Sequence, residues 1–492
     1  MAIAIKSKND RANQKVRLFL CIVFLFSAFP VHAQYFATKP LNQAYDYLLN
    51  YRMDSCQAIL LNSPKNPYNY YLQLLSTSVK LVIADDETLF KSLKKEEAEF
   101  LSAVESEKFS NAEKSFLKAE ARLQWGLIKL KYGEEFSAFW NIKNAYSLAK
   151  ATNDEFPEYL PNYKTLGLLR TMLGLVPEKY NWVLSLFGMQ GDLAGGLQEL
   201  QKVARYEKDF SLEAHISLAM IYGYLLGDHE RSVSEMQLVY GARKSTLTNY
   251  LYSLLLMKNS ASSMAMEVII TTDGKNRLAY FNYLTGEILL QQGHYQEAIS
   301  AYESFKKTTD SQSMVKDATY KTALCFYLSG DKTSFSETWS KVRGAGEAKN
   351  EADKYAQSEA IMNSLSHPDL YKLRFATDGG YFDLAKSIMR GVDLSKLSSK
   401  DMCEYHYRAG RLFHKTNQLP AAKDSYSKAI SSQGDNNWYF APNAALQLAI
   451  IFIDERKFDD AKKALKQLDA YQGYPYESSI RQHAKSLRNS LN

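Results

Sequence analysis

Apolar residues recur along most of this sequence at intervals of three and four positions, which is the spacing of one face of an α-helix. No stretch shows a convincing alternation of the kind that predicts a strand. Only 11 prolines and 23 glycines interrupt the 492 residues. A chain this long usually divides into several domains, unless it is an array of repeats that grows by stacking. The pattern predicts an all-α protein.

The clearest internal repeat covers residues 404–430 and predicts two antiparallel helices. Gly410 stands where the first helix needs a small residue, and Ala422 takes the same place in the second. Two helices approach closely only if small residues lie at their crossing, with large side chains such as Phe413 and Tyr426 filling the space beside it. This arrangement is the tetratricopeptide pattern.

Other segments follow the same pattern. The units at residues 281–305 and 441–468 match it at five or more positions, and weaker units occur at 119–149 and 378–389. The array predicted from them is a tetratricopeptide-type solenoid, an α-α superhelix of antiparallel helix pairs. Its matching residues are Gly286, Leu289, Tyr295, Ala298, Tyr302, Phe305, Leu448, Ala449, Phe452, Phe458, Ala461 and Leu465, then Ala323, Phe326 and Trp339, and Trp125, Gly126, Ala138, Ile142 and Ala145.

The first 33 residues have the composition of a cleaved secretory signal peptide. Five basic residues precede an apolar run from Leu18 to Phe29, and Pro30 then ends it ahead of Val31-His32-Ala33. A spanning helix needs about 20 apolar residues, and this run has 12. Cys21 lies inside the run, which argues against a lipoprotein. We expect cleavage near Ala33, before Gln34, and an exported protein that is periplasmic, secreted or associated with the outer envelope.

Removing residues 1–33 takes away five basic residues and Asp10, so the formal charge of +6 becomes +2. A nearly neutral chain has no electrostatic footprint for nucleic acid or for an anionic membrane surface. Cys56, Cys325 and Cys403 then remain, an odd and widely spaced set that does not form a disulfide framework. We interpret them as buried apolar side chains.

Residues 155–200 break the repeat pattern. Two prolines are followed by an apolar helix predicted at 163–175, a break at Pro177, and a second apolar helix ending near Gly188. The two helices predict an apolar helical hairpin, at about 160–190, that is buried inside the solenoid. Insertion into a membrane is the alternative, but Arg170 interrupts the hairpin and each half is too short to span a bilayer.

This segment resembles the tetratricopeptide repeat protein 39 family and its fungal inclusion-body clearance relatives. The likeness rests on Leu160-Pro161, Gly167, Pro177 and the run LSLFGMQGDLAGGLQEL, and it continues through EYHYRAG and WYFAPNAALQLA to the C-terminus. The resemblance implies an all-helical repeat protein without known chemistry, tied to lipid-related and organelle-surface roles. The export signal departs from that family, and the family offers no catalytic residues to transfer.

The sequence contains no motif that points to catalysis, and no Gly-x-Ser-x-Gly turn supports a Ser/His/Asp triad. The run GMQGDLAGG precedes a helix but lacks the Gly-Lys-Ser/Thr ending of a nucleotide loop, so we interpret it as a tight turn with Asp192 as the helix cap. His406 and His414 are too far apart to hold one ion, and no paired-cysteine spacing appears. We expect no catalytic activity, no metal and no cofactor. Trp182 and Trp438 are interpreted as core anchors.

The residues of the first helices that do not pack on their partners should line the concave face, where such arrays usually hold ligands. Tyrosine and arginine provide large contact areas, which is why they dominate binding hot spots. The alternative is that these residues pack between neighbouring repeats, and in the last unit Leu446, Ile450 and Ile453 indicate a covered helix. The candidate site residues are Tyr280, Tyr283, Glu287, Tyr320, Tyr327, Tyr407, Arg411 and His414.

The sequence thus predicts three parts: a signal peptide at 1–33, a helical region with degenerate repeats and the hairpin at 34–200, and a repeat array at 201–492. The expected function is that of an exported, non-catalytic protein that binds a polypeptide partner or holds an envelope assembly together. Two alternatives remain open, a glycan-binding protein of the outer surface and a lipid-handling protein. Nucleic acid is not an expected partner, and the mature chain should carry no membrane span.

Overall fold

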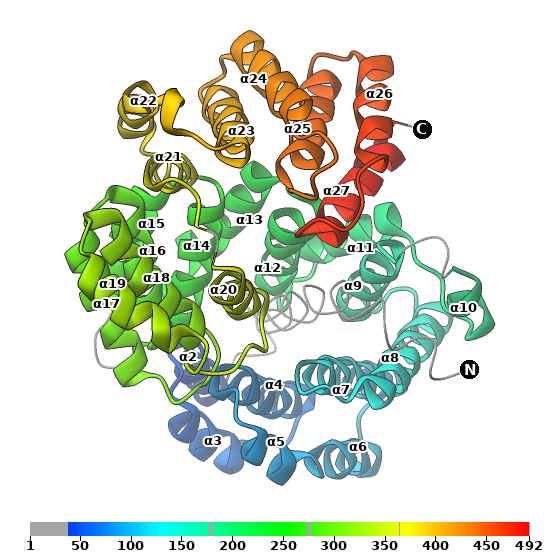
Figure 1. Ribbon diagram of the computed structural model, residues 1–492. Helices are drawn as coiled ribbons and strands as arrows, with labels where there is room; N and C mark the ends of the chain where they lie inside the picture. Colours follow the sequence, from blue (N-terminus) through cyan, green and yellow to red (C-terminus); the bar gives the residue numbers. More distant parts are fainter. Residues whose placement is uncertain (1–37, 177–180, 273–276, 364, 492) are drawn as a thin grey trace. The chain divides into compact units, whose positions relative to one another are not determined.

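The computed structural model describes residues 38–176, 181–272, 277–363 and 365–491, and within these ranges every regular element is a helix (Figure 1). The predicted all-α class is therefore confirmed. The predicted signal peptide and the break at Pro177 lie outside the described residues. Of the helices in these ranges, none has the length and apolar character needed to cross a bilayer.

The chain divides into two compact units. The described part of the N-terminal unit comprises residues 38–255, with 271, 272 and 277, and that of the C-terminal unit comprises 256–270 and 278–491. The predicted division at residue 200 falls inside a helix, and the units change instead at Leu255 and Leu256. The helices that follow residue 200 stay with the N-terminal unit because they complete its core, as described below.

The N-terminal unit consists of helices joined by short connections. Its elements are α2 (Lys39–Leu49), α3 (Met53–Asn62), α4 (Pro67–Ala84), α5 (Glu87–Leu93), α6 (Glu96–Ser106), α7 (Asn111–Lys131), α8 (Glu135–Glu155), α9 (Pro161–Gly174), α10 (Asn181–Leu186), α11 (Leu193–Tyr206), α12 (Ser211–Met220), the π-helix η2 (Ile221–Leu226), α13 (His229–Ala242) and most of α14 (Thr246–Lys258).

Helices α7 and α8 form the unit predicted at 119–149, and they lie side by side (Figure 1). A methyl group on Gly126 would lie 3.0 Å from the Ile142 side chain, so the small residue sits at the crossing as expected. Trp125, Ala138 and Ala145 are buried around it. The repeat pattern therefore identified this pair correctly.

Of the two helices predicted to form a buried hairpin, the first is buried and the second is largely exposed. Helix α9 is buried through Leu166 and Leu169, but it packs mainly against α11 rather than against α10. Helix α10 has only six residues, and Trp182 and Leu186 on it are 61% and 71% exposed. The apolar pattern predicted that α10 would be buried against α9. Helix α11 occupies that place instead, because it packs along α9. Trp182 is accordingly not a core anchor.

Glycines allow α9 and α11 to pack backbone against backbone. A methyl group on Gly167 would lie 2.8 Å from the carbonyl oxygen of Gly196, and one on Gly196 would lie 2.5 Å from the carbonyl oxygen of Gly167. Asp192 caps α11 by accepting a hydrogen bond of 2.9 Å from the backbone N–H of Gly195. The glycine-rich run is thus a helix start and a helix crossing. Asp192 is the helix cap that the sequence predicted.

A lysine lies at the centre of the N-terminal unit, enclosed by two carboxylates and three aromatic rings. Lys164 on α9 is 1% exposed, and its Nζ lies 3.1 Å from carboxylate oxygens of both Glu120 on α7 and Glu213 on α12. The hydroxyl of Tyr71 on α4 donates to Glu213 at 2.8 Å. Four helices therefore meet at one buried charge cluster. The rings within 6.0 Å of Nζ belong to Tyr71, Phe116 and Phe210.

The cluster has one more carboxylate than it has cations, and this sets its protonation. Burial would lower the pKa of Lys164, but Glu120 and Glu213 outweigh it and raise that pKa above its ordinary value. Burial raises the pKa of Glu213 to about 8, against the lowering influence of Lys164 and with the help of Glu120. The lysine is therefore charged, and Glu213 retains a proton near neutral pH.

We expect Glu213 to make the free energy of unfolding fall as the pH rises from about 5 to 9. The folded pKa of Glu213 lies above the ordinary value of 4.5, so its contribution is fully present below the unfolded pKa and is lost as the pH passes through about 8. Glu199 and Asp353, with pKa values raised by burial to about 7, act in the same direction. Urea unfolding of Glu213→Gln across this range should show a shallower pH dependence than the wild type.

The exposed Glu105 provides the control for this experiment. Its carboxylate belongs to a surface pair with Lys118, so Glu105→Gln should keep the wild-type pH dependence of stability. An unchanged slope in Glu213→Gln would show that this carboxyl does not carry the proton.

The C-terminal unit contains the clearest repeats. Its elements, after the last residues of α14, are α15 (Ser262–Ile270), α16 (Tyr280–Gln292), α17 (Tyr295–Thr308), α18 (Val315–Ser329), α19 (Lys332–Val342), α20 (Glu351–Met362), α21 (Pro368–Gly379), α22 (Phe382–Gly391), the 3-10 helix η4 (Leu394–Lys396), α23 (Ser399–Lys415), α24 (Leu419–Ser432), α25 (Phe440–Asp454), α26 (Phe458–Asp469) and α27 (Glu477–Ser490).

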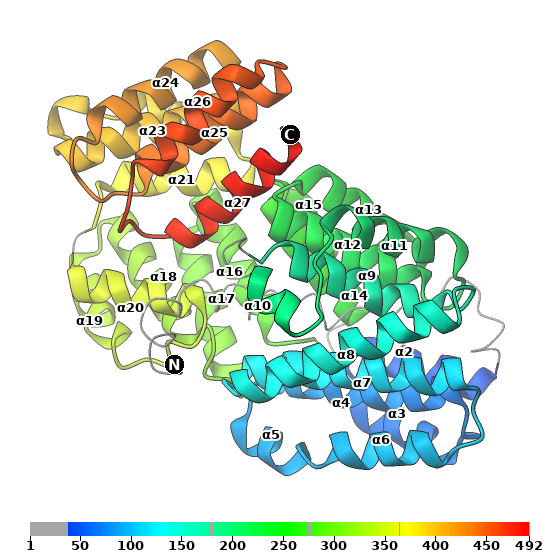
Figure 2. The same ribbon diagram turned by 90° about the vertical axis from the view of Figure 1, so that its right-hand side faces the viewer.

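The predicted crossings are confirmed in this unit. A methyl group on Gly286 of α16 would lie 2.7 Å from the Tyr302 ring of α17, and one on Gly410 of α23 would lie 2.6 Å from the Tyr426 ring of α24. Both pairs thus place a tyrosine ring flat in the space that the glycine leaves. Helices α23 to α26 lie side by side in chain order (Figure 1), and Figure 2 shows the same four helices after a quarter turn.

The last repeat is closed by the C-terminal helix. Ile480 and Ala484 of α27 are buried in the same core cluster as Leu446 of α25, and Ile450 packs against that cluster. The prediction that this helix is covered is therefore confirmed. The three cysteines Cys56, Cys325 and Cys403 are free and buried, as interpreted from their spacing.

Candidate functional site

Three of the tyrosines predicted to line an open face are buried, which corrects the expectation for them. Tyr283 is 6% exposed, Tyr320 is 2% and Tyr407 is 1%. Tyr407 packs against the rings of Tyr426 in its own pair and Phe440 in the next. These rings fill the space between successive helix pairs, so the alternative weighed above, packing between neighbouring repeats, applies to them.

Tyr283 and Glu287 belong to a polar network between two helix pairs. The Tyr283 hydroxyl donates to Asp317 on α18 at 2.5 Å, and Lys321 Nζ lies 2.5 Å from the carboxylate of Glu287. The hydroxyl of Tyr302 also donates to Glu287 at 2.5 Å. Both predicted residues are engaged within the protein, and their interactions fix the register of α16 against α18.

Tyr280 on α16 and Tyr327 on α18 are half-buried. The Tyr280 ring lies 5.6 Å from that of Phe305, and the Tyr327 hydroxyl donates to the backbone carbonyl of Ser366 at 3.3 Å. Each side chain therefore has contacts within its own unit. Their partial exposure leaves a role in binding as a prediction.

Arg411 and His414 of α23 are also only partly buried. The Arg411 side chain is 27% exposed, and its guanidinium lies 3.3 Å from Asp378 of α21. His414 shares a hydrogen bond of 3.4 Å with the Tyr426 hydroxyl. Burial, and then the charges of Arg411 and Lys415, lower the pKa of His414 to about 4. The imidazole is therefore neutral at physiological pH.

Arg411 belongs to a larger group that sequence reasoning missed, which we call the arginine–tyrosine cluster. Asp378 lies between two guanidinium groups, 3.7 Å from Arg374 and 3.3 Å from Arg411. Their side chains are 39%, 30% and 27% exposed, so one partly exposed carboxylate faces two partly exposed cations. Three half-buried tyrosines lie close enough to Arg374 to interact with its charge, and the cluster comprises Tyr355, Arg374, Asp378, Arg411, Tyr439 and Tyr476.

The tyrosines of the cluster pack ring against ring, edge to face between Tyr439 and Tyr476 and tilted between Tyr355 and Tyr476. The ring of Tyr476, which directly precedes α27, lies 5.8 Å from that of Tyr355 on α20 and 5.5 Å from that of Tyr439. Burial raises the pKa of Tyr439 to about 12, so its hydroxyl stays protonated and can donate a hydrogen bond. The sequence contains 34 tyrosines, but this abundance does not indicate which of them meet in the folded protein.

A buried ion pair between Arg408 and Glu404 contacts the cluster at Tyr439. The Arg408 guanidinium donates to Glu404 Oε1 at 2.8 Å and also contacts the Tyr439 hydroxyl. Ser366 donates to the second oxygen of Glu404 at 2.7 Å. These contacts hold Tyr439 in place between α23 and α25. The exposed faces of the cluster thus rest on a fixed frame, which reduces the entropy lost when a ligand binds.

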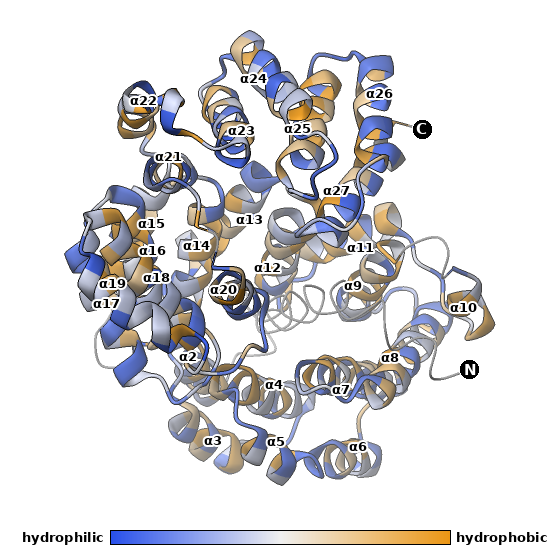
Figure 3. Cartoon of the chain, in the orientation of Figure 1, coloured by the Kyte–Doolittle hydropathy of each residue, from blue (hydrophilic) through white to orange (hydrophobic). Residues whose placement is uncertain are grey.

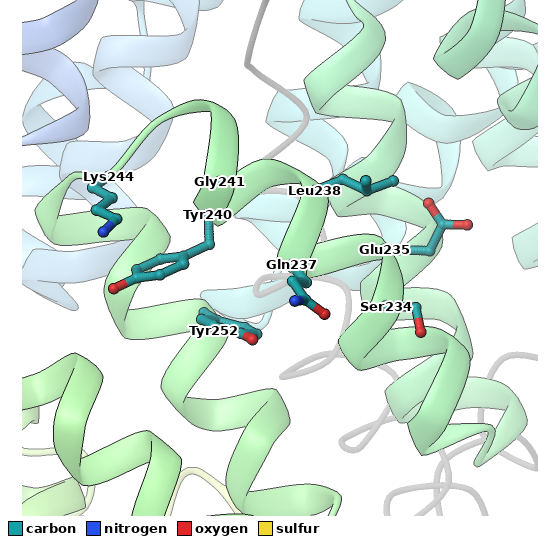
Figure 4. Close-up of a pocket in the computed structure, with 8 residues that line it drawn as sticks. All are labelled: Ser234, Glu235, Gln237, Leu238, Tyr240, Gly241, Lys244 and Tyr252. Atoms are coloured by element: carbon teal, nitrogen blue, oxygen red, sulfur yellow. The ribbon is translucent and has the colours of Figure 1, made fainter.

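A separate hollow of about 840 Å³ lies on the N-terminal unit, along α13 and the start of α14. Its side chains do not converge on one point, because Ser234 and Glu235 lie at the opposite end from Lys244 and Tyr240 (Figure 4). It offers no arrangement of groups around one reacting atom. Its lining residues are Ser234, Glu235, Gln237, Leu238, Tyr240, Gly241, Lys244 and Tyr252.

No group of three or more histidine, cysteine or carboxylate side chains that could hold a metal ion occurs among the described residues. The arginine–tyrosine cluster likewise contains no nucleophile paired with a base. Its chemistry is that of recognition, through guanidinium groups, phenol hydroxyls and aromatic faces.

Comparison with known proteins finds a tetratricopeptide repeat protein among those similar to this chain. No family model matches the chain. The chain is 21% identical over 355 residues to the tetratricopeptide repeat protein ttc-39B of Caenorhabditis elegans. This match covers 64% of the present chain and 61% of the worm protein. The chain is thus similar in sequence to a tetratricopeptide repeat protein, and its helix pairs have small residues at their crossings as that repeat requires.

Solved structures of tetratricopeptide-type proteins are also similar. A monomeric mutant of IFIT1 with Gppp-AAAA is 13% identical, with 90% of this chain and 93% of that chain covered and a TM-score of 0.34. The TPR domain of P58(IPK) is 16% identical, with 76% and 98% covered and a TM-score of 0.21. These likenesses are too distant to carry an argument about binding.

Proposed function

We propose that this tetratricopeptide-type chain is an exported, non-catalytic protein that binds a polypeptide partner through the arginine–tyrosine cluster and so contributes to an assembly in the cell envelope. One observation carries the proposal: Arg374 and Arg411 share Asp378 while all three remain partly exposed, beside tyrosines fixed by ring packing. Residues of this kind supply most of the binding energy in protein interfaces. Export rests on the composition of residues 1–33.

The site is tested by removing its two cations. Arg374→Gln combined with Arg411→Gln should weaken binding of the partner about tenfold or more, because truncation of a central arginine commonly costs more than about 1.4 kcal/mol. The partner is first identified by crosslinking and co-purification from cell envelopes, and its affinity for the purified chain is then measured by calorimetry. Mass spectrometry of the native N-terminus tests export, with Gln34 as the expected first residue.

A matched control has the same change of charge elsewhere in the unit. Arg390→Gln combined with Lys462→Gln alters two exposed residues of α22 and α26 and should leave binding unchanged. Circular dichroism confirms that both variants fold. Equal affinity of the wild type and the Arg374→Gln, Arg411→Gln variant would place the binding site elsewhere. Recovery of no protein partner would lead to glycan and lipid binding assays instead.

A further inference from the structure

Arg374 of α21 has hydrogen-bond donors that the described part of the protein does not use. Its guanidinium lies 3.7 Å from an oxygen of Asp378, which is longer than a hydrogen bond, and it donates to no other described residue. By contrast, Arg408 on α23 donates to Glu404 at 3.0 and 2.8 Å. The Arg374 side chain is 30% exposed, so a ligand can reach its donors. The planar fork of a guanidinium matches the two oxygens of a carboxylate.

One carboxylate is shared by two guanidinium groups at this site. Asp378 lies 3.7 Å from Arg374 and 3.3 Å from Arg411, with one of its oxygens directed to each. A single carboxylate neutralises one of the two cations. The group therefore keeps a positive charge, and that charge belongs to two arginine side chains that are 30% and 27% exposed.

The other charges nearby do not remove this excess. Arg408 and Glu404 form a buried pair of their own. Burial raises the pKa of Glu359 on α20, and the charges of Lys400 and then Arg374 oppose that rise. Together with the shared carboxylate and its second arginine, these groups comprise four cations and three carboxylates, so the formal net charge is 4 − 3 = +1.

The surroundings of the cluster favour a singly charged, polar occupant. Figure 3 shows that α23, which carries Arg411, has more hydrophilic residues than α25 beside it. The group that Arg374 and Arg411 already share is a side-chain carboxylate. A second carboxylate would bring the formal charge to zero, whereas a doubly charged phosphate would leave an excess of negative charge.

We propose that Arg374 binds the side-chain carboxylate of an aspartate or glutamate in an internal segment of the partner polypeptide, while Asp378 stays paired with Arg411. The incoming carboxylate supplies the acceptors that the Arg374 guanidinium lacks among the described residues. Asp378 acts as an internal competitor, because its negative charge opposes the approach of a second carboxylate. This inference rests on the proposed function, since it specifies the chemistry of the partner at the same cluster.

The test begins with random peptides of about 12 residues displayed with their C-terminus fused to the carrier, so that side chains supply the carboxylates. The folded full-length mature chain is the bait, and the Arg374→Gln, Arg411→Gln variant identifies peptides that bind elsewhere. The peptides that need the cluster should contain an aspartate or a glutamate. In amidated synthetic copies, changing that residue to asparagine or glutamine should weaken binding about tenfold or more, as measured by fluorescence anisotropy.

Asp378→Asn separates this inference from a purely structural role of the cluster. It should raise the affinity for the acidic peptides about threefold or more, because the competing negative charge is removed. Misfolding does not produce such a gain. Arg374→Lys keeps the charge but loses the planar fork, so it should weaken binding about tenfold. As matched controls, Asp383→Asn and Arg390→Lys alter exposed residues of α22 and should leave the affinity unchanged.

The possible outcomes distinguish this inference from the proposed function. Peptides that need Arg374 and Arg411 but no acidic residue would overturn the inference and leave the binding site in place. An unchanged or lower affinity in Asp378→Asn would also overturn it, as would binding only by copies with a free C-terminal carboxylate. If every peptide bound the Arg374→Gln, Arg411→Gln variant as well as the wild type, the cluster would not bind peptides, and the proposed site would fail together with the inference.

Discussion

Replacing Lys164 with methionine is expected to lower the free energy of unfolding by about 3–5 kcal/mol. The substitution keeps most of the side-chain volume but removes the cation that lies 3.1 Å from both Glu120 and Glu213. The Glu120 carboxylate would then lie beside the protonated Glu213 in a site that is 1% exposed, without a cation and with hydrogen bonds from Tyr71, Thr165 and Gln124 as the remaining support. Guanidinium unfolding followed by circular dichroism measures the loss.

A compensating variant separates charge from packing. Adding Glu120→Gln and Glu213→Gln to Lys164→Met leaves neutral side chains at all three positions and should recover much of the lost stability. Lys150→Met, at an exposed pair with Asp154, should leave stability unchanged. If the triple variant were no more stable than Lys164→Met alone, the charge on the two glutamates would not account for the loss. Hydrogen exchange should locate the change in α4, α7, α9 and α12.

The second large effect is expected at the crossing of α9 and α11. Gly196→Ala should cost about 1–3 kcal/mol, because the added methyl group would lie 2.5 Å from the backbone carbonyl of Gly167 and from the Thr171 hydroxyl. Neither helix can yield at this point without moving its backbone. Differential scanning calorimetry should show a lower Tm than that of the wild type.

Gly241 on α13 provides the control, because an added methyl group there should raise the stability instead of lowering it. A methyl group there has no neighbour within 4 Å, so Gly241→Ala should raise stability by about 0.5–1 kcal/mol through helix propensity alone. If Gly196→Ala proved as stable as Gly241→Ala, the close approach of the two helices would be refuted.

Repeat spacing predicted the helix pairs because their packing depends on local rules. Gly410 lies against Tyr426, and Gly126 against Ile142, at the positions where a small residue is needed. Such contacts join helices that are neighbours in the chain, so a fixed interval in the sequence reports them. The helix cap at Asp192 and the covered face of α25 were predictable for the same reason.

The functional surfaces depend on contacts that the repeat does not encode. Tyr355 and Tyr476 are 121 residues apart in the sequence, and no spacing rule indicates that their rings meet. Lys164 lies 44 residues from Glu120 and 49 from Glu213, and no repeat interval indicates that the three side chains meet. The apolar character of α10 was visible, but burial could not be deduced from it, because whether a helix is covered depends on its neighbours.

The three buried cysteines also give the molecule internal reporters of local opening. Burial raises the pKa values of the Cys56 and Cys403 thiols to about 12, so the reactive thiolate is scarce in the folded state. An alkylating reagent can modify a thiol only after the helix that holds it has opened. Because Cys56 lies in the N-terminal unit and Cys325 and Cys403 lie in the C-terminal unit, pulsed alkylation records the breathing of each unit separately, without an added label.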